Sequence, residues 1–325
     1  MSHSPEAHIE GGIRRRHQPT PIEESPSPSE IVIGVYLRAL RKALRRSLAD
    51  TARHTQLSTS TICRVERAEP PTHPRDVAKL LRYYEADGPE IQYLTSNLPM
   101  AQHASRQEQR AAGADAVNNA ARRGPWDLWD DTAPAGVARY VAVSRVASEA
   151  VQYTLNRVPP GYRTPEYRSV VTNPDVCSSP DEPFPDTPVW LTRVGRPPGQ
   201  RRTLLLDETA LYKPVGSAGA MARQLRHLLR LMDGMTTAGP VTIRVRPRDG
   251  QISLISSYDE VAELTVSGHR IYTAVTLWPW YETRSGLAQA LHRSLHQAVE
   301  QAPGHQASYD LIKQAADHWA KQAVS

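Results

Sequence analysis

The chain has 325 residues, which is long enough for two domains with tails. Its net charge is +5 and 39% of its residues are hydrophobic, enough for packed cores although Phe184 is its one phenylalanine. No apolar run approaches the length that spans a bilayer, and no signal peptide is expected before the first apolar helix. The cysteines, Cys63 and Cys177, lie far apart in the sequence, so we expect no structural disulfide and a cytoplasmic location.

Residues 1–28 are rich in Pro, Ser, Glu and His and are predicted to form a disordered arm, because they offer nothing to bury. The arginines at 14–16 could contact DNA or simply be solvated. Residues 29–98 are predicted to form an all-α domain of five short helices. Ser29 is predicted to cap the first helix, and Ser47 and Ser58 the second and third. A fourth helix is expected after Pro74 and a fifth at about 89–98.

The segment 48–68 indicates two short helices joined by a sharp turn at 54–58, the layout of a helix-turn-helix. The segment contains Ala52, Leu57, Ser58, Ile62, Arg64, Val65 and Glu66. These residues resemble the pattern of lambda-repressor-like, xenobiotic-response-element type regulators, a family whose fold has five helices. This chain departs from the pattern at Gln56 and Ala68, where the family usually has Gly, and at Cys63, where it often has Ser. A residue other than Gly in the turn carries a modest strain.

The charge distribution favours a DNA-facing surface. Residues 36–82 hold eleven Lys or Arg against four acids, a surplus of +7, so the remainder of the chain sums to −2. A basic module of this kind is typical of phosphate contact, although a single arginine run would more often be a solvated helix face. We predict that Thr59, Ser60 and Arg64 read bases from the start of the second of the two helices. The side chains expected on the DNA backbone are those of Arg38, Arg45, Arg46, Arg53 and Arg67. The family resemblance implies a structural ion pair between Arg41 and Glu66.

Residues 99–123 are predicted to be a linker and 124–325 an α+β domain with a mainly antiparallel sheet. Helices are expected at 138–155, after Thr164, and at 209–212, 218–232, 285–300 and 308–323. Strands are expected at 203–206, 241–245, 252–256, 263–266 and 272–278. The run 189–194 is too short to assign, and the proline-rich residues 174–188 look like a loop.

Several blocks of this second part resemble an actinobacterial effector domain of unknown function that follows a lambda-repressor-like domain in antitoxin-like regulators. The similar blocks are 140–142 with 149–150, 158–167, 206–211 with 214–216, 221–225 and 241–247. Together with the first domain, the resemblance covers about residues 30–320. The chain departs from the family at Ser144, where Glu is usual, and around Gln200, where an Arg-Gln pair is usual.

Few residues in the second domain suggest catalysis. Asp207 and Glu208 could do acid–base chemistry, but they fit better as the capping acids of a short helix. His227 and His269 stand alone. His292 and His296 are spaced to share a metal ion, but no HExxH motif or third acidic ligand accompanies them in the sequence. The aromatic run 278–281 is more typical of a core or an interface than of a ligand cage. We therefore predict no enzymatic activity, no cofactor and no metal.

These observations predict a sequence-specific DNA-binding transcriptional regulator with a C-terminal sensing or protein-docking domain. Its expected partners are an operator in double-stranded DNA, a second copy of the chain, and a small molecule or a small acidic protein. The alternative is an antitoxin-like interaction protein that binds a small partner and regulates its own operon. The acidic partner is implied by the family resemblance alone. An enzyme fused to a DNA-binding domain is a third, weaker alternative.

Overall fold

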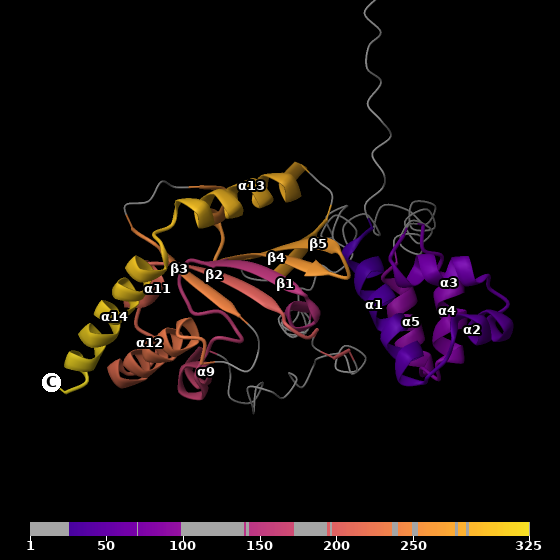
Figure 1. The fold of residues 1–325 in the computed structure, drawn as a ribbon, viewed down its shortest axis with the longest axis horizontal. Helices are drawn as coiled ribbons and strands as arrows, with labels where there is room; N and C mark the ends of the chain where they lie inside the picture. Colours follow the sequence, from indigo (N-terminus) through magenta and orange to yellow (C-terminus); the bar gives the residue numbers. More distant parts are fainter. Residues whose placement is uncertain are drawn as a thin grey trace, which may run out of the picture.

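The computed structural model describes residues 26–69, 71–98, 140, 143–171, 194–195, 197–235, 240–248, 253–276, 279–283 and 286–324. The predictions for residues 1–25, for the linker 99–123 and for the proline-rich segment 174–188 lie outside these ranges. Figure 1 shows the helical N-terminal domain beside a larger domain built on one sheet. None of the described helices is both long enough and apolar enough to cross a membrane.

The N-terminal domain has the five helices that the sequence predicts. They are α1 (Pro28–Ala43), α2 (Leu48–Thr55), α3 (Thr59–Glu66), α4 (Pro74–Tyr83) and α5 (Gly88–Ser96). The predicted cap of α1 was wrong, because Ser27 and not Ser29 caps the helix. The Ser27 hydroxyl accepts from the Glu30 amide at 3.2 Å, and the Glu30 carboxylate accepts from the Ser27 amide at 2.8 Å. This reciprocal pair needs an acid three residues after the cap, which Glu30 supplies.

Helices α1 and α3 approach closely at Gly34. A Cβ atom at this position would lie 2.7 Å from the carbonyl oxygen of Val65 and 3.2 Å from that of Glu66. The missing side chain therefore lets α1 lie directly against the C-terminal end of α3. Leu37 and Ile62, both fully buried, fill the core beside this contact. The position of α3 thus depends on close contact between its backbone and the backbone of α1.

The C-terminal domain contains a six-stranded mixed sheet in the order β3-β2-β1-β4-β5-β6. Its strands are β1 (Glu149–Thr154), β2 (Arg201–Asp207), β3 (Val241–Arg246), β4 (Glu260–Val266), β5 (His269–Val275) and β6 (Pro279–Glu282). The three pairs on the β1-β4-β5-β6 side are antiparallel, but β1-β2 and β2-β3 are parallel. The prediction of a mainly antiparallel sheet therefore describes only that side. Helix α12 (Ala218–Met232) connects β2 to β3, and such a crossover joins parallel neighbours.

Two local predictions were wrong. The helix expected at 138–155 does not extend beyond Val146, and β1 takes its second half. Strand β1 lies between β2 and β4 and is buried along most of its length, so the pairing on both sides outweighs the local helical pattern. The strand expected at 252–256 is replaced by a short 3₁₀ turn, Leu254–Ser257. The aromatic run was predicted to be core or interface, and its described part lies in the edge strand β6 with Tyr281 fully buried.

Helices cover both faces of the sheet (Figure 1). Helix α13 (Gly286–Gln301) lies on one face, over β1, β4 and β5. Helices α12 and α14 (His305–Gln322) cover the β2-β3 half of the other face, with the short helices α9 (Pro165–Val171) and α11 (Thr209–Tyr212) beside them. The two C-terminal helices were predicted correctly, within three residues at each boundary.

The remaining part of that second face meets the N-terminal domain. One hydrophobic cluster joins side chains of α1 to α5 with Ala262, Leu264, Val266 and Ile271 of β4 and β5. At its margin His269 Nε2 donates a hydrogen bond to the carbonyl oxygen of Arg67, 2.7 Å away. Arg67 is the C-cap of α3. The β4-β5 hairpin therefore contacts the last turn of the helix predicted to enter DNA.

Candidate nucleic-acid interface

The geometry of α2 and α3 is that of a helix-turn-helix. Ser47 caps α2 by accepting from the Asp50 amide at 3.0 Å, and Ser58 caps α3 by accepting from the Thr61 amide at 2.9 Å. Gln56 ends α2 in the left-handed region, with φ of 57°. This residue makes the sharp turn that the sequence predicts, at the position where Gly would be unstrained. Both caps predicted from the sequence are confirmed.

Helix α3 has one buried side and one exposed side. Ile62 and Val65 are buried in the domain core, as expected. Thr59, Ser60 and Arg64, the predicted base readers, are all exposed. Their hydroxyl and guanidinium groups are the kind of donors and acceptors that recognise base edges in a major groove. All three are therefore accessible, and their contact with bases stays a prediction.

Arg41 of α1 and Glu66 of α3 form an ion pair. The Nε and Nη2 atoms of Arg41 donate to the two carboxylate oxygens of Glu66 at 2.6 and 2.7 Å. The side chains are 14% and 5% exposed. The hydrogen bonds to Glu66 raise the pKa of Arg41 above its ordinary value. Because the pair is two-pronged and nearly buried, it fixes the angle between α1 and α3.

The five arginines predicted on the DNA backbone are all exposed, but their local contacts differ. The guanidinium of Arg46 lies over the ring of Tyr83, 5.4 Å from its centroid. Arg53 and Arg67 have weak surface ion pairs, with Asp50 at 3.3 Å and with Glu69 at 3.6 Å. Exposed pairs of this kind contribute little, so phosphates could displace them.

Arg38 and Arg45 have no ion pair within the described part of the chain. Arg45 also has a φ of 52°, in the left-handed region just after α1. Its amide donates to the carbonyl oxygen of Lys42, and the next amide to that of Arg41, so it closes the helix where Gly is usual. Arg45 thus occupies a position where a residue other than Gly has a backbone cost.

The acids Asp207 and Glu208 serve local structure. Asp207 is buried, accepts from the Thr209 amide at 3.0 Å and from the Tyr153 hydroxyl at 3.3 Å, and faces Arg246 at 3.5 Å. Asp207 therefore bonds the first amide of α11, as the sequence favoured, but the N-cap of the helix is Glu208, whose side chain makes no capping hydrogen bond. Glu208 accepts from the Arg248 amide at 3.0 Å. Of the two other histidines, His269 hydrogen bonds to the carbonyl oxygen of Arg67 at the end of α3. Burial lowers the pKa of His227 below its ordinary value.

Sequence reasoning missed one side chain that completes a cluster. His292 and His296 were considered without an acidic companion, but Glu263 of β4 lies directly beneath them. No spacing rule connects residues 263 and 292, because the contact arises only when α13 lies across β4. A weak signal was available: Glu263 stands between Ala262 and Leu264 in a largely apolar strand, and an acid at such a position needs a partner when it is buried.

Comparison with protein families identifies both halves. A helix-turn-helix domain model matches residues 32–94, and the model described as Domain of unknown function (DUF5753) matches residues 137–314. The second match spans more than half of the chain, which therefore belongs to the DUF5753 family. The helix-turn-helix match indicates that this family member is a DNA-binding regulator. A search of curated proteins and a search of solved structures each found no match.

Proposed function

We propose that this protein is a sequence-specific transcriptional regulator that reads an operator with α3. The observation that carries the proposal is the exposed first turn of α3, where Thr59 and Ser60 follow a capped helix start and Arg64 lies one turn further on. The surrounding domain has a surplus of positive charge, which suits phosphate contact. Within the helix-turn-helix class, the residues of α2 and α3 favour the lambda-repressor-like, xenobiotic-response-element type, and the resemblance of the C-terminal blocks favours an actinobacterial regulator.

The protein is further proposed to act as a homodimer on paired half-sites. Helix α3 has eight residues, and one helix of this length contacts only a few base pairs. Regulators of this class obtain selectivity by placing two such helices one helical turn of DNA apart. We assign the dimer contact to the C-terminal domain, whose edge strand β3 and helix α14 lie away from α3 (Figure 1).

The C-terminal domain is proposed to dock or sense an effector. A cavity of about 360 Å³ between α9 and α12 is lined by Arg223, Arg226 and Arg230, together with Thr164, Pro165 and Glu166. Arg223 pairs with Glu166 at 2.6 Å, and all three arginines are exposed. This surface suits an acidic partner. The antitoxin-like alternative stays a prediction from the family resemblance, and no catalytic activity is proposed.

Selection from a pool of random DNA duplexes tests the proposal. The full-length protein should enrich a defined motif at moderate salt, because base contacts add to the salt-dependent phosphate contacts. The double variant Thr59→Ala with Ser60→Ala should lose or change that motif while its circular dichroism and Tm stay unchanged. Ser169→Ala, an exposed change on α9, is the matched control and should select the wild-type motif. Enrichment of no motif by the wild-type protein would reject sequence-specific binding.

A further inference from the structure

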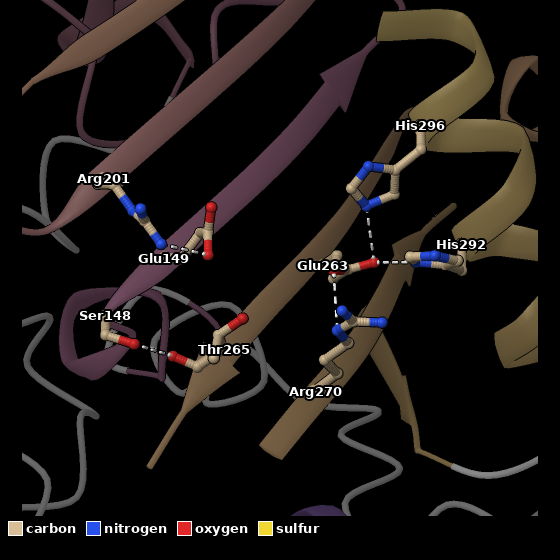
Figure 2. A network of polar contacts seen from close by, with 8 residues as sticks. All are labelled: Ser148, Glu149, Arg201, Glu263, Thr265, Arg270, His292 and His296. Carbon is tan, nitrogen blue, oxygen red and sulfur yellow. Dashed lines mark hydrogen bonds and ion pairs between the residues drawn. The ribbon is translucent and has the colours of Figure 1, made fainter. Parts of the chain in front are cut away.

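Glu263, His292 and His296 form a compact cluster between β4 and α13 (Figure 2). His292 Nδ1 lies 2.7 Å from Glu263 Oε2, and His296 Nε2 lies 3.1 Å from the same oxygen. The two imidazole rings are 4.4 Å apart between centroids. Two nitrogens and one carboxylate oxygen, from two separate elements, thus converge on one point.

The fold fixes the positions of these ligands. Helix α13 is anchored on the sheet by Ala288, Leu291, Leu295 and Ala298, all buried. His292 and His296 each follow one of the two leucines, so both lie at the same edge of the buried stripe and one turn apart. Glu263 comes from the middle of β4, the strand beneath this edge.

Neighbouring side chains orient two of the three ligands. Arg270 of β5 contacts the other carboxylate oxygen of Glu263, with its Nε atom 3.5 Å from Oε1 (Figure 2). This contact leaves Oε2 for the imidazoles. Tyr272, which is paired with Glu263 across β4 and β5, packs edge-on against the His292 ring with centroids 6.2 Å apart. Such outer contacts hold ligands in place and strengthen metal sites.

We propose that Glu263, His292 and His296 bind one divalent transition metal ion of the zinc class. Zinc bonds to imidazole nitrogen and carboxylate oxygen are about 2.0–2.2 Å long, so tetrahedral ligands lie about 3.3 Å apart. The two nitrogen–oxygen distances, 2.7 and 3.1 Å, are about 0.6 and 0.2 Å shorter than this, and all three ligand atoms lie within 4.8 Å of one another. A small outward movement of the partly exposed histidines would admit the ion.

The exposure of the cluster leaves a side open for further ligands. Glu263 is 6% exposed, whereas His292 and His296 are 33% and 40% exposed. The carboxylate is therefore at the bottom and the imidazoles are at the rim, facing solvent. Two histidines, one carboxylate and an open position form a ligand set that zinc accepts, and imidazole also suits nickel and copper. The site lies on the β4-β5 hairpin, whose turn contacts α3, but the proposal does not depend on DNA binding.

The test uses full-length protein stripped of metal with a chelator. Zinc should raise the Tm in a concentration-dependent way, and cobalt should give the visible absorption of a four- or five-coordinate site. His296→Gln should weaken zinc binding in calorimetry by at least 10-fold, since even outer partners of a ligand cost 10–100-fold. Glu263→Gln should do the same. His305→Gln, an exposed change at the start of α14, is the control and should bind as wild type.

If Glu263→Gln fails to fold, His296→Gln still tests the proposal, because His296 is partly exposed and its replacement should not prevent folding. If the three side chains are only hydrogen bonded to one another, zinc will leave the Tm unchanged. Zinc binding of equal strength in wild type and His296→Gln would place any bound metal elsewhere. Either result would overturn the proposal. Neither result bears on whether α3 reads DNA, because every measurement is made without DNA.

Discussion

At the scale of single residues, the turn between α2 and α3 is strained at Gln56. A left-handed conformation costs an L-residue about 1–2 kcal/mol. Replacement by Gly removes this strain, but the larger entropy of Gly in the unfolded chain offsets part of the stabilisation. Gln56→Gly should therefore stabilise the protein by up to about 1 kcal/mol in chemical denaturation. Gln92→Gly, the same change on an exposed turn of α5, should destabilise it by about 1 kcal/mol. Equal effects of the two changes would contradict the account of the turn.

The Arg41–Glu66 pair also makes a prediction at this scale. Each partner leaves a nearly buried charge when the other is removed, so Glu66→Gln and Arg41→Ala should each lower stability. Because both changes remove the same contact, their effects should be non-additive by about 0.5–3 kcal/mol in a double-mutant cycle. Additive losses would show that the two side chains act independently in solution.

Individual contacts could be predicted from the sequence where a local pattern or a family resemblance indicated them. Ser58 as a cap follows from sequence alone, and the resemblance paired Arg41 with Glu66. Glu263 could not be placed beside His292, because their contact depends on how α13 crosses the sheet. Glu30 was missed in the same way: its carboxylate also accepts from the distant Thr72 amide at 3.1 Å. Pairings between distant segments leave no periodic trace in a sequence.

At the scale of elements, the contact between α1 and α3 depends on Gly34. In an open helix, replacing Gly by Ala stabilises by about 1 kcal/mol. Gly34→Ala should instead destabilise by about 1–3 kcal/mol, because the new Cβ meets the Val65 carbonyl at 2.7 Å and backbone must move. Gly219→Ala in α12 is the matched control. Its new Cβ meets only the end of the flexible Arg223 side chain, so it should be neutral or stabilising. A stabilised Gly34→Ala protein would refute this close approach.

Most helices and strands could be predicted from the sequence, but the pairing of the strands was harder to predict. Amphipathic spacing and capping residues identified α1 to α5 because these helices are local. The strand β1 was read as helix because its residues are buried on both faces, which removes the alternation that marks a half-buried strand. The parallel pairing of β2 with β3 could have been inferred from the long helix α12 between them.

At the scale of the whole molecule, we expect tight DNA binding to require both domains. Residues 1–98 alone should bind DNA weakly and with a steep salt dependence, because phosphate contacts dominate a single small module. The full-length protein should sediment as a dimer and bind its selected site much more tightly, since two half-sites are engaged together. Sedimentation of both forms, with titration of each against the same duplex, measures this. A monomeric full-length protein that binds no better than the fragment would defeat the proposed dimer.

We propose that α3 reads bases while the surrounding arginines contact phosphates. The deciding measurement compares Arg64→Ala with Arg38→Ala in affinity for the selected site, for single-base variants of that site and at several salt concentrations. Arg64→Ala should lose about 1–3 kcal/mol at one base position and relax the preference there. Arg38→Ala should weaken binding to all sequences alike and reduce the log–log salt slope by about 0.9. An Arg64→Ala protein with wild-type affinity and unchanged base preference would contradict the claim.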